Sequence, residues 1–146
     1  MVSLSIKNSK IHQDLIDFGV IPNKTHIIHY PTKLKNEFHR HFIRGLLDGD
    51  GCIHRISDKY PRSRSVDICG NPDFCKELKQ VIEHELNIHC SLINVDKNKG
   101  KSTMRVTISG AIQCQKFLDW IYEDAELYLP RKYNVYKQYC DTYIET

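Results

Sequence analysis

The sequence lacks paired cysteines, long apolar runs and a strong net charge. None of its six cysteines forms a CxxC pair, and its eight histidines follow no zinc-binding pattern. Scattered thiols of this kind are typical of reduced cysteines inside a cell. No apolar run approaches the ~20 residues of a membrane span, and no signal-peptide hydrophobic region opens the chain. We therefore expect an intracellular protein (cytoplasm, nucleoid or nucleus, or organelle) with no membrane partner.

The composition is that of a globular protein. Of the 146 residues, 40% are hydrophobic and 27% are charged, which is enough for one domain with its own core. The net charge of +3 decides little about partners, so the distribution of charge matters more. Lysines and arginines cluster at residues 62–64, 97–101 and 131–132.

One stretch, residues 42–51, carries the most information. An apolar, helix-compatible run contains Gly45 and ends in Asp48-Gly49-Asp50-Gly51. Glycine inside a helix costs about 1 kcal/mol relative to alanine, so Gly45 suggests that another helix approaches closely. A glycine just past a helix end can take the positive φ that terminates the helix. The stretch therefore predicts a helix pressed against another helix, with two carboxylates at its C-terminal end.

Residues 43–51 resemble the nine-residue signature of the LAGLIDADG homing endonucleases. Arg44 departs from the signature, and the positions identical to it are Gly45, Leu46, Asp48, Asp50 and Gly51. The alternative of a calcium-binding loop fails, because Cys52 and Ile53 follow Asp50 and Lys59 stands where the bidentate glutamate belongs.

The hydrophobic pattern predicts the elements that follow the signature helix, which spans about residues 33–48. Asn71-Pro72-Asp73 is a strong helix start, with Asn71 as the N-cap and Pro72 at the first helical position. The other expected elements are strands at 52–57, 63–69, 90–95 and 104–109, and helices at 112–122 and 127–143, the last broken at Pro130. This α-β-β-α-β-β-α order is that of one LAGLIDADG unit. It implies an α+β fold with an antiparallel four-stranded sheet and helices on one face.

The N-terminal segment resembles the end of this unit. A predicted strand at 3–7, a cap at Asn8-Ser9, a helix closed by Gly19 and the motif Pro22-x-Lys24 match the order of residues 105–132. We divide the chain at this segment into residues 1–31, a possible remnant of a preceding repeat, and residues 32–146, the endonuclease-like domain. An independent N-terminal helix packed on a single unit is the alternative.

The resemblance also implies a catalytic site. In the family, two signature helices pack together and the final aspartate of each reaches the scissile phosphates with Mg²⁺. This role falls on Asp50, with Gly49 offering a carbonyl to the metal. Gly45, Leu46 and Asp48 would lie at the helix interface, where Asp48 serves as a cap or interface hydrogen bond. Because the chain has one signature, we expect a homodimer.

A basic residue often stands near the end of the fourth strand in this family and helps to stabilise charge at the attacked phosphate. That place falls near Ser109, which is a departure from the pattern. Lys7 occupies the corresponding place in the N-terminal half-repeat and is therefore a second catalytic candidate. The turn lysines are further candidates, although such residues usually contact only phosphate or solvent.

Double-stranded DNA is the expected partner, bound on the open face of the sheet. Alternation along the strands, together with the basic turns, selects the candidate contacts, although a merely solvated polar face is the alternative. They are His54, Arg62, Arg64, Ser65, Asp67, Lys97, Lys99, Lys101, Arg105 and Thr107.

Three functions remain open at this point. The first is a site-specific, metal-dependent DNA endonuclease that cuts both strands of a long target. The second is a catalytically weak or inactive nucleic-acid-binding protein with the same fold, such as a regulator or intron maturase. The third is a fragment of a two-unit enzyme that is inactive alone. Asp50 favours the first and Ser109 favours the second.

Overall fold

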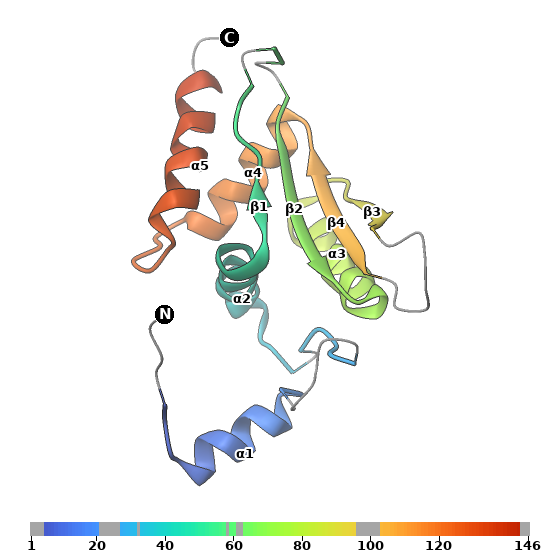
Figure 1. Ribbon diagram of the computed structural model, residues 1–146, viewed down its shortest axis with the longest axis vertical. Coiled ribbons are helices and arrows are strands. Elements are labelled where there is room, and N and C mark those ends of the chain that lie inside the picture. Colours follow the sequence, from blue (N-terminus) through green and yellow to red (C-terminus); the bar gives the residue numbers. More distant parts are fainter. Residues whose placement is uncertain are drawn as a thin grey trace.

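The chain folds into an antiparallel sheet with helices packed on one face, and one further helix precedes this unit (Figure 1). The computed structural model describes residues 5–20, 27–31, 33–57, 59–60, 63–95 and 103–143. The helices are α1 (Ser9–Asp17), α2 (Asn36–Asp50), α3 (Pro72–Leu86), α4 (Ala111–Tyr122) and α5 (Pro130–Tyr143). The strands are β1 (Cys52–Ile53), β2 (Ser65–Gly70), β3 (Ser91–Asn94) and β4 (Met104–Ser109). In these ranges no helix has the length and apolar character needed to cross a membrane.

The four strands run in the order β1-β2-β4-β3, and every neighbouring pair is antiparallel. From α2 to α4 the element order is the predicted α-β-β-α-β-β-α, so the expected α+β fold is confirmed. The first strand is shorter than predicted, because only Cys52 and Ile53 belong to it. Beyond them, the His54 amide still donates to the Ser65 carbonyl (3.0 Å), and a single bridge joins Ser57 to Tyr60.

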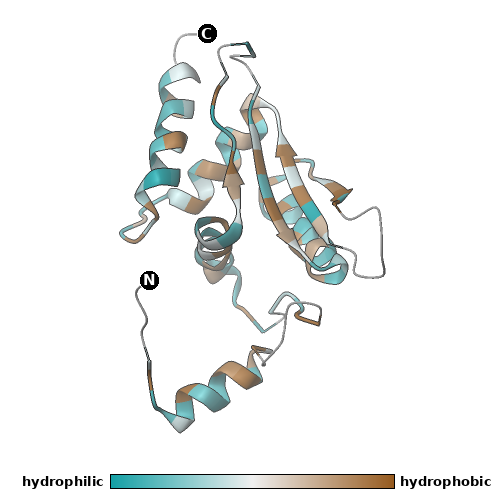
Figure 2. Cartoon of the chain, viewed as in Figure 1, coloured by the Kyte–Doolittle hydropathy of each residue, from teal (hydrophilic) through white to brown (hydrophobic). Residues whose placement is uncertain are grey.

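The core lies between the sheet and the helices. Alternate residues of the two central strands point into it, including Val66 and Ile68 on β2 and Val106 and Ile108 on β4, all nearly inaccessible to solvent. Figure 2 shows apolar positions interspersed with polar ones along these strands. The opposite side chains of the same strands form the open face of the sheet, which the helices leave uncovered.

Local sequence explains how α3 begins and ends. The Asn71 side chain accepts a hydrogen bond from the Phe74 amide (3.0 Å), and Pro72 occupies the first helical position, as predicted. The helix ends at Asn87, which takes a left-handed conformation with φ of 48°. The last helix also starts at a proline, since α5 begins at Pro130 rather than at Leu127.

The N-terminal helix is capped as predicted but buries nothing. The Asn8 side chain accepts from the amides of Lys10 (2.9 Å) and Ile11 (3.1 Å), and Gly19 follows the helix with φ of +83°. No residue of α1 is buried. The predicted strand at 3–7 is wrong in its described part, residues 5–7, which pair with no other described strand.

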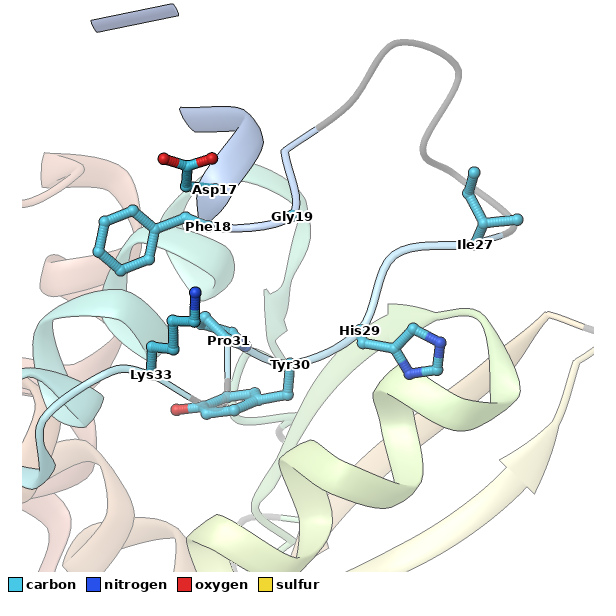
Figure 3. A pocket seen from close by; sticks show the side chains of 8 residues that line it. All are labelled: Asp17, Phe18, Gly19, Ile27, His29, Tyr30, Pro31 and Lys33. Carbon is cyan, nitrogen blue, oxygen red and sulfur yellow. The ribbon is translucent and has the colours of Figure 1, made fainter. Parts of the chain in front are cut away.

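The segment before α2 joins the core of the unit that follows it. Tyr30 is buried, its hydroxyl lies 2.7 Å from His39 Nδ1, and its amide donates to Glu77 (2.7 Å). Asn71 donates to the Ile28 carbonyl (2.7 Å). Between this segment and the end of α1 lies a cavity of about 290 Å³, with Phe18 on one side and Tyr30 on the other (Figure 3). The division at residue 31 stays a prediction, but Ile28 and Tyr30 pack with the second part.

Candidate active site and nucleic-acid interface

The signature helix ends at a crowded glycine. Gly51 follows α2, and its amide donates to the carbonyls of Leu46 (3.2 Å) and Leu47 (3.0 Å). A Cβ at Gly51 would come within 2.6–2.9 Å of side-chain and backbone atoms of Leu47. The φ of Gly51 is −79°, so Gly51 does not take the positive φ that a glycine at a helix end can adopt. Glycine is required here by lack of space and not by a left-handed conformation.

A buried lysine holds the carbonyl groups at this helix end. Lys132, in the first turn of α5, is only 4% exposed. Its ammonium donates to the carbonyls of Leu47, Asp48 (2.9 Å) and Gly51 (2.6 Å). The last carbonyls of a helix have no partner within the helix and carry the negative end of its dipole, so a cation is well placed there. Burial, followed by the nearby Arg131 charge, lowers the pKa of Lys132, whereas Asp48 and Asp50 act in the opposite direction.

The first of the two signature aspartates is held within its own chain. Asp48 Oδ1 accepts a hydrogen bond from the Tyr122 hydroxyl (3.0 Å), and Oδ2 accepts one from the Leu129 amide (2.9 Å). Burial of the ring, followed by the Asp48 charge, raises the pKa of Tyr122, so its hydroxyl remains a donor. Asp48 therefore joins α2 to α4 and to the connection before α5. The predicted interface hydrogen bond is made between helices of one chain.

The second aspartate, Asp50, is exposed and has no hydrogen-bond or ion-pair partner among the described residues. Asp50 is the last residue of α2, and its carboxylate makes no hydrogen bond or ion pair with any residue of the described ranges. Gly49 beside it is also exposed. No group of three or more histidine, cysteine, aspartate or glutamate side chains that could hold a metal ion is found in the described part of the chain. Within one chain, Asp50 is thus a single exposed carboxylate on a firmly anchored helix end.

One side of α2 is left open by the rest of the chain. Gly45 and Gly49 lie on it, and a Cβ at either position would meet nothing within 4 Å. Phe38, about two turns before Gly45, is 47% exposed, and Phe42 and Leu46 at the margin are half-buried. We call these five residues the open side of α2. The opposite side carries Ile43 and Leu47, which are completely buried and so are excluded from any exposed patch.

The open face of the sheet carries a polar cluster centred on Asp67. Strand pairing places Asp67 opposite both Cys52 on β1 and Thr107 on β4. Its carboxylate lies 2.8 Å from His54 Nε2, accepts from the Thr107 hydroxyl (2.7 Å), and lies 3.4 Å from an Arg105 guanidinium nitrogen. The Asp67 side chain is 8% exposed, whereas His54 is 50% and Arg105 is 35% exposed. The buried Asp67 therefore holds two side chains that carry hydrogen-bond donors, the exposed His54 and the half-buried Arg105.

The match to known families agrees with this geometry. A family model described as a LAGLIDADG-like domain matches residues 37–122, which is more than half of the chain. The chain belongs to the LAGLIDADG-like domain family. The matched range covers α2 through α4 and includes both signature aspartates and all four strands. α1 and α5 lie outside it.

Solved structures of homing endonucleases are similar to this LAGLIDADG-like chain. The structure of I-CvuI in complex with the I-CreI target has a TM-score of 0.47 and 13% sequence identity, over 72% of this chain and 68% of its own. I-TnaI has a TM-score of 0.46 and 16% identity, over 74% of this chain and 70% of its own. No protein of curated function shows significant similarity to the chain.

The predicted catalytic lysine is not brought to the signature of the LAGLIDADG-like domain. Lys7 is exposed and makes no hydrogen bond or ion pair with a residue that the structure describes. It precedes α1, which Figure 1 shows apart from the sheet and its helices. Ser109 ends β4 on the open face, where its exposed side chain brings no positive charge. The cation that does lie at this helix end is Lys132, which sequence reasoning placed only in a basic cluster.

The predicted DNA contacts divide into three groups. On the open face, His54 is exposed, whereas Arg105 and Ser65, at the start of β2, are half-buried; their contact with DNA stays a prediction. Asp67 and Thr107 share that face but are buried, so their predicted contact with DNA stays a prediction that burial in this structure does not favour. The residues Arg62, Lys97, Lys99 and Lys101 lie outside the described ranges.

Arg64 requires a separate correction. It has the same alternation as Val66 and Ile68 and therefore points to the side covered by helices. Its guanidinium lies 4.8 Å from the Tyr139 ring centre and donates to the Thr142 hydroxyl (2.5 Å), and the residue is 7% exposed. The prediction of Arg64 as a phosphate or guanine contact is wrong in this structure, where it joins β2 to α5.

Proposed function

We propose that this protein is a site-specific endonuclease that hydrolyses phosphodiester bonds in double-stranded DNA with the help of a divalent cation. The observation that carries the proposal is the exposed, unpaired Asp50 carboxylate on a helix end that Lys132 and Asp48 hold in place. A carboxylate at the C-terminal end of a helix is electrostatically unfavourable, which makes a bound cation a natural partner. Membership of the LAGLIDADG-like family supports the same function.

Asp50 and the Gly49 carbonyl fit a magnesium ion that the DNA also helps to hold. Mg²⁺ is typically bound by one or two carboxylates together with substrate phosphates and water, so one exposed aspartate per chain suits it. When bound, the ion would polarise the scissile phosphate and lower the pKa of an attacking water. The chain's own part is to fix the position of Asp50, because Lys132 and Asp48 restrain the last turn of α2.

The open side of α2 supports a homodimer. The exposed Gly45 and Gly49 allow two such helices to approach closely, and the described N-terminal segment leaves both positions free. A two-fold axis at this contact would bring two Asp50 carboxylates together, one for each DNA strand. It would also join two sheets side by side, with the His54 and Arg105 donors of both on one surface. Identical subunits would then read a palindromic or nearly palindromic target.

A second function, binding without cleavage, is favoured by the hydrogen bonding of Lys132, the cation that contacts the end of α2 in the described part of the chain. An ammonium group has three hydrogens to donate, and all three of those on Lys132 are directed at backbone carbonyls. Lys132 is therefore engaged in holding α2 and not free to contact an attacked phosphate. Such a protein would act as a regulator or an intron maturase.

A cleavage assay on a randomised duplex library separates the two functions. We expect binding and cutting of a subset of sequences with Mg²⁺, and binding alone with EDTA. The Asp50→Asn variant should bind without cutting, whereas Asp14→Asn, the same change on an exposed residue of α1, should cut like the wild type. Selective binding with no cutting under any condition would establish the second function. Absence of both binding and cutting would refute both.

A further inference from the structure

A positively charged cavity lies beside the candidate active site. It has a volume of about 280 Å³ and opens between β1 and the start of α5. Residues 51–55 form one wall, and Arg131, Lys132 and Val135 form the other. The first of these wall residues, Gly51, directly follows Asp50. Figure 1 shows α5 alongside β1, one of the two edge strands of the sheet, and the cavity lies between these two elements.

The charged side chains that line this cavity are all basic. Arg55 and Arg131 are exposed, and neither makes a hydrogen bond or ion pair with any described residue. Lys132 lies between them and the helix end, and no carboxylate belongs to the lining. The charge of Arg131, the neighbour of Lys132 in the sequence, helps to lower the pKa of the lysine after burial, whereas Asp48 and Asp50 act in the opposite direction. Three cations thus line one cavity, and two of them, Arg55 and Arg131, have unused donors.

We propose that this cavity binds a phosphate of the DNA backbone that neighbours the phosphodiester bond at Asp50. The proposal rests on the proposed function, because it takes the duplex to lie over the open face of the sheet. Guanidinium groups match phosphate oxygens with two parallel hydrogen bonds, and a phosphate would relieve the repulsion among the three cations. Arg55 and Arg131 would then be positioning residues that set the register of the strand relative to Asp50 without touching the reacting atoms.

Backbone contacts have a measurable signature that differs from base recognition. Each phosphate neutralised by a protein cation adds about one unit to the slope of log K against log salt concentration. Because both cations are proposed to hold the same phosphate, we expect the Arg55→Gln, Arg131→Gln double variant to lower the salt slope for a short duplex of arbitrary sequence by about 1 for each bound chain, and each single variant to lower it by no more than that. Lys116→Gln, which removes an exposed cation from α4, is the matched control and should leave the slope unchanged.

A scan with neutral methylphosphonate linkages locates the phosphate. In a duplex selected with the wild-type protein, we expect one linkage in each half-site whose neutralisation weakens wild-type binding about tenfold. The same substitution should leave binding by the Arg55→Gln, Arg131→Gln double variant unchanged, because its partner is already absent. Preference for particular bases should be the same in both proteins, and thermal unfolding should show that both are folded.

The outcomes separate this proposal from the proposed function. If the double variant is as sensitive as the wild type at every linkage, the cavity holds no backbone phosphate and the proposal is overturned, even if the protein cuts DNA. If the linkage effect appears but Mg²⁺ produces no cutting, the phosphate site stands and the endonuclease function fails. If inorganic phosphate shifts the Arg55 and Arg131 side-chain NMR signals while the linkage scan shows nothing, the ligand is a free anion and the DNA source is wrong.

Discussion

The two sides of α2 differ in burial: one packs into the core and the other is open. The covered side presents Ile43 and Leu47, both completely buried, and the hydrogen-bonded Asp48. The open side presents Gly45 and Gly49, where an added Cβ would meet nothing within 4 Å, and it ends beside the unpaired Asp50. One helix therefore supplies part of the core on one side and a free surface with a free carboxylate on the other.

Because the two sides of α2 have different surroundings, substitutions on them should affect different measured quantities. A substitution on the covered side should change the free energy of unfolding of one chain and leave assembly and chemistry nearly intact. A substitution on the open side should do the reverse, because no stabilising contact within the chain is lost there. The following four changes test that separation, and they run from the largest expected effect to the smallest.

The largest effect is expected at Asp50. Asp50→Asn should reduce DNA cleavage to background, because the amide is a poor metal ligand, while DNA binding stays equal or becomes tighter as a charge that repels phosphate is removed. The free energy of unfolding should rise slightly, by about 0.3–1 kcal/mol, since a carboxylate at a helix C-terminus is unfavourable. Single-turnover cleavage, gel-shift titration and urea unfolding measure the three quantities. Wild-type cleavage in this variant would remove Asp50 from the mechanism.

The next effect is expected at Lys132. Lys132→Met keeps the apolar part of the side chain but leaves the carbonyls of Leu47, Asp48 and Gly51 without their shared donor. Buried groups left unsatisfied cost about 1–3 kcal/mol, so we expect the free energy of unfolding to fall by about 2–3 kcal/mol. Lys116→Met on the exposed surface of α4 is the control and should change it by less than about 0.5 kcal/mol. Equal stability of both variants would show that Lys132 does not hold the helix end.

Gly45 should respond with opposite signs in the two measurements. Gly45→Leu places a side chain in open space, and leucine favours a helix over glycine, so the isolated chain should be more stable by up to about 1 kcal/mol. In a dimer the same side chain would push two helices apart, which typically costs about 1–3 kcal/mol and weakens the dimer roughly 5- to 150-fold. Sedimentation and urea unfolding measure the two effects.

The control for Gly45 is Asn134→Leu, a comparable apolar addition on the exposed surface of α5. It should leave the association constant unchanged. An unaltered oligomer in the Gly45→Leu variant would place Gly45 outside any subunit interface. A monomeric wild type, with and without DNA, would exclude the homodimer altogether.

Sequence was a good guide where the determining contacts are local. The start of α3 depends on Asn71 and Pro72 and on an amide three residues later, so it could be predicted from four adjacent residues. The element order followed from hydrophobic periodicity, and the resemblance of residues 43–51 located Asp50 at the helix end. Each of these features needs information from only a few neighbouring positions.

Contacts between residues that are far apart in the sequence could not be predicted from it. Lys132 meets the Leu47 carbonyl across 85 positions, and nothing in the basic pair at 131–132 indicates that one of the two is buried against a helix end. Asp67 is buried because β2 and β4 pair in a register that brings Thr107 and Arg105 to it. A pattern of alternation gives the face of a residue but not which neighbours will cover it.

Two errors show opposite weaknesses of pattern reading. Arg64 alternates with Val66 and Ile68 and so belongs to the covered side, but its place next to a predicted turn favoured an exposed role. α1 has a clear apolar stripe that includes Ile11, Leu15 and Phe18, yet all three remain 45–52% exposed. An amphipathic pattern predicts that a helix has a face suited to burial, and only tertiary structure decides whether that face is covered.

The smallest effect is expected at Asp48, and it completes the comparison with Asp50 two residues later. Asp48→Asn keeps one acceptor oxygen and turns the other into a donor, so one of its two partners, the Tyr122 hydroxyl, must rotate and accept. We expect the free energy of unfolding to fall by about 0.5–1.5 kcal/mol. A double-mutant cycle with Tyr122→Phe should give a coupling energy of at least about 0.5 kcal/mol, because the two side chains share a hydrogen bond. Cleavage and dimerisation should remain at wild-type levels, the reverse of the Asp50→Asn result. Loss of cleavage in Asp48→Asn with unchanged stability would mean that the carboxylate acts on the open side of α2, and the division of the helix into two sides would then fail.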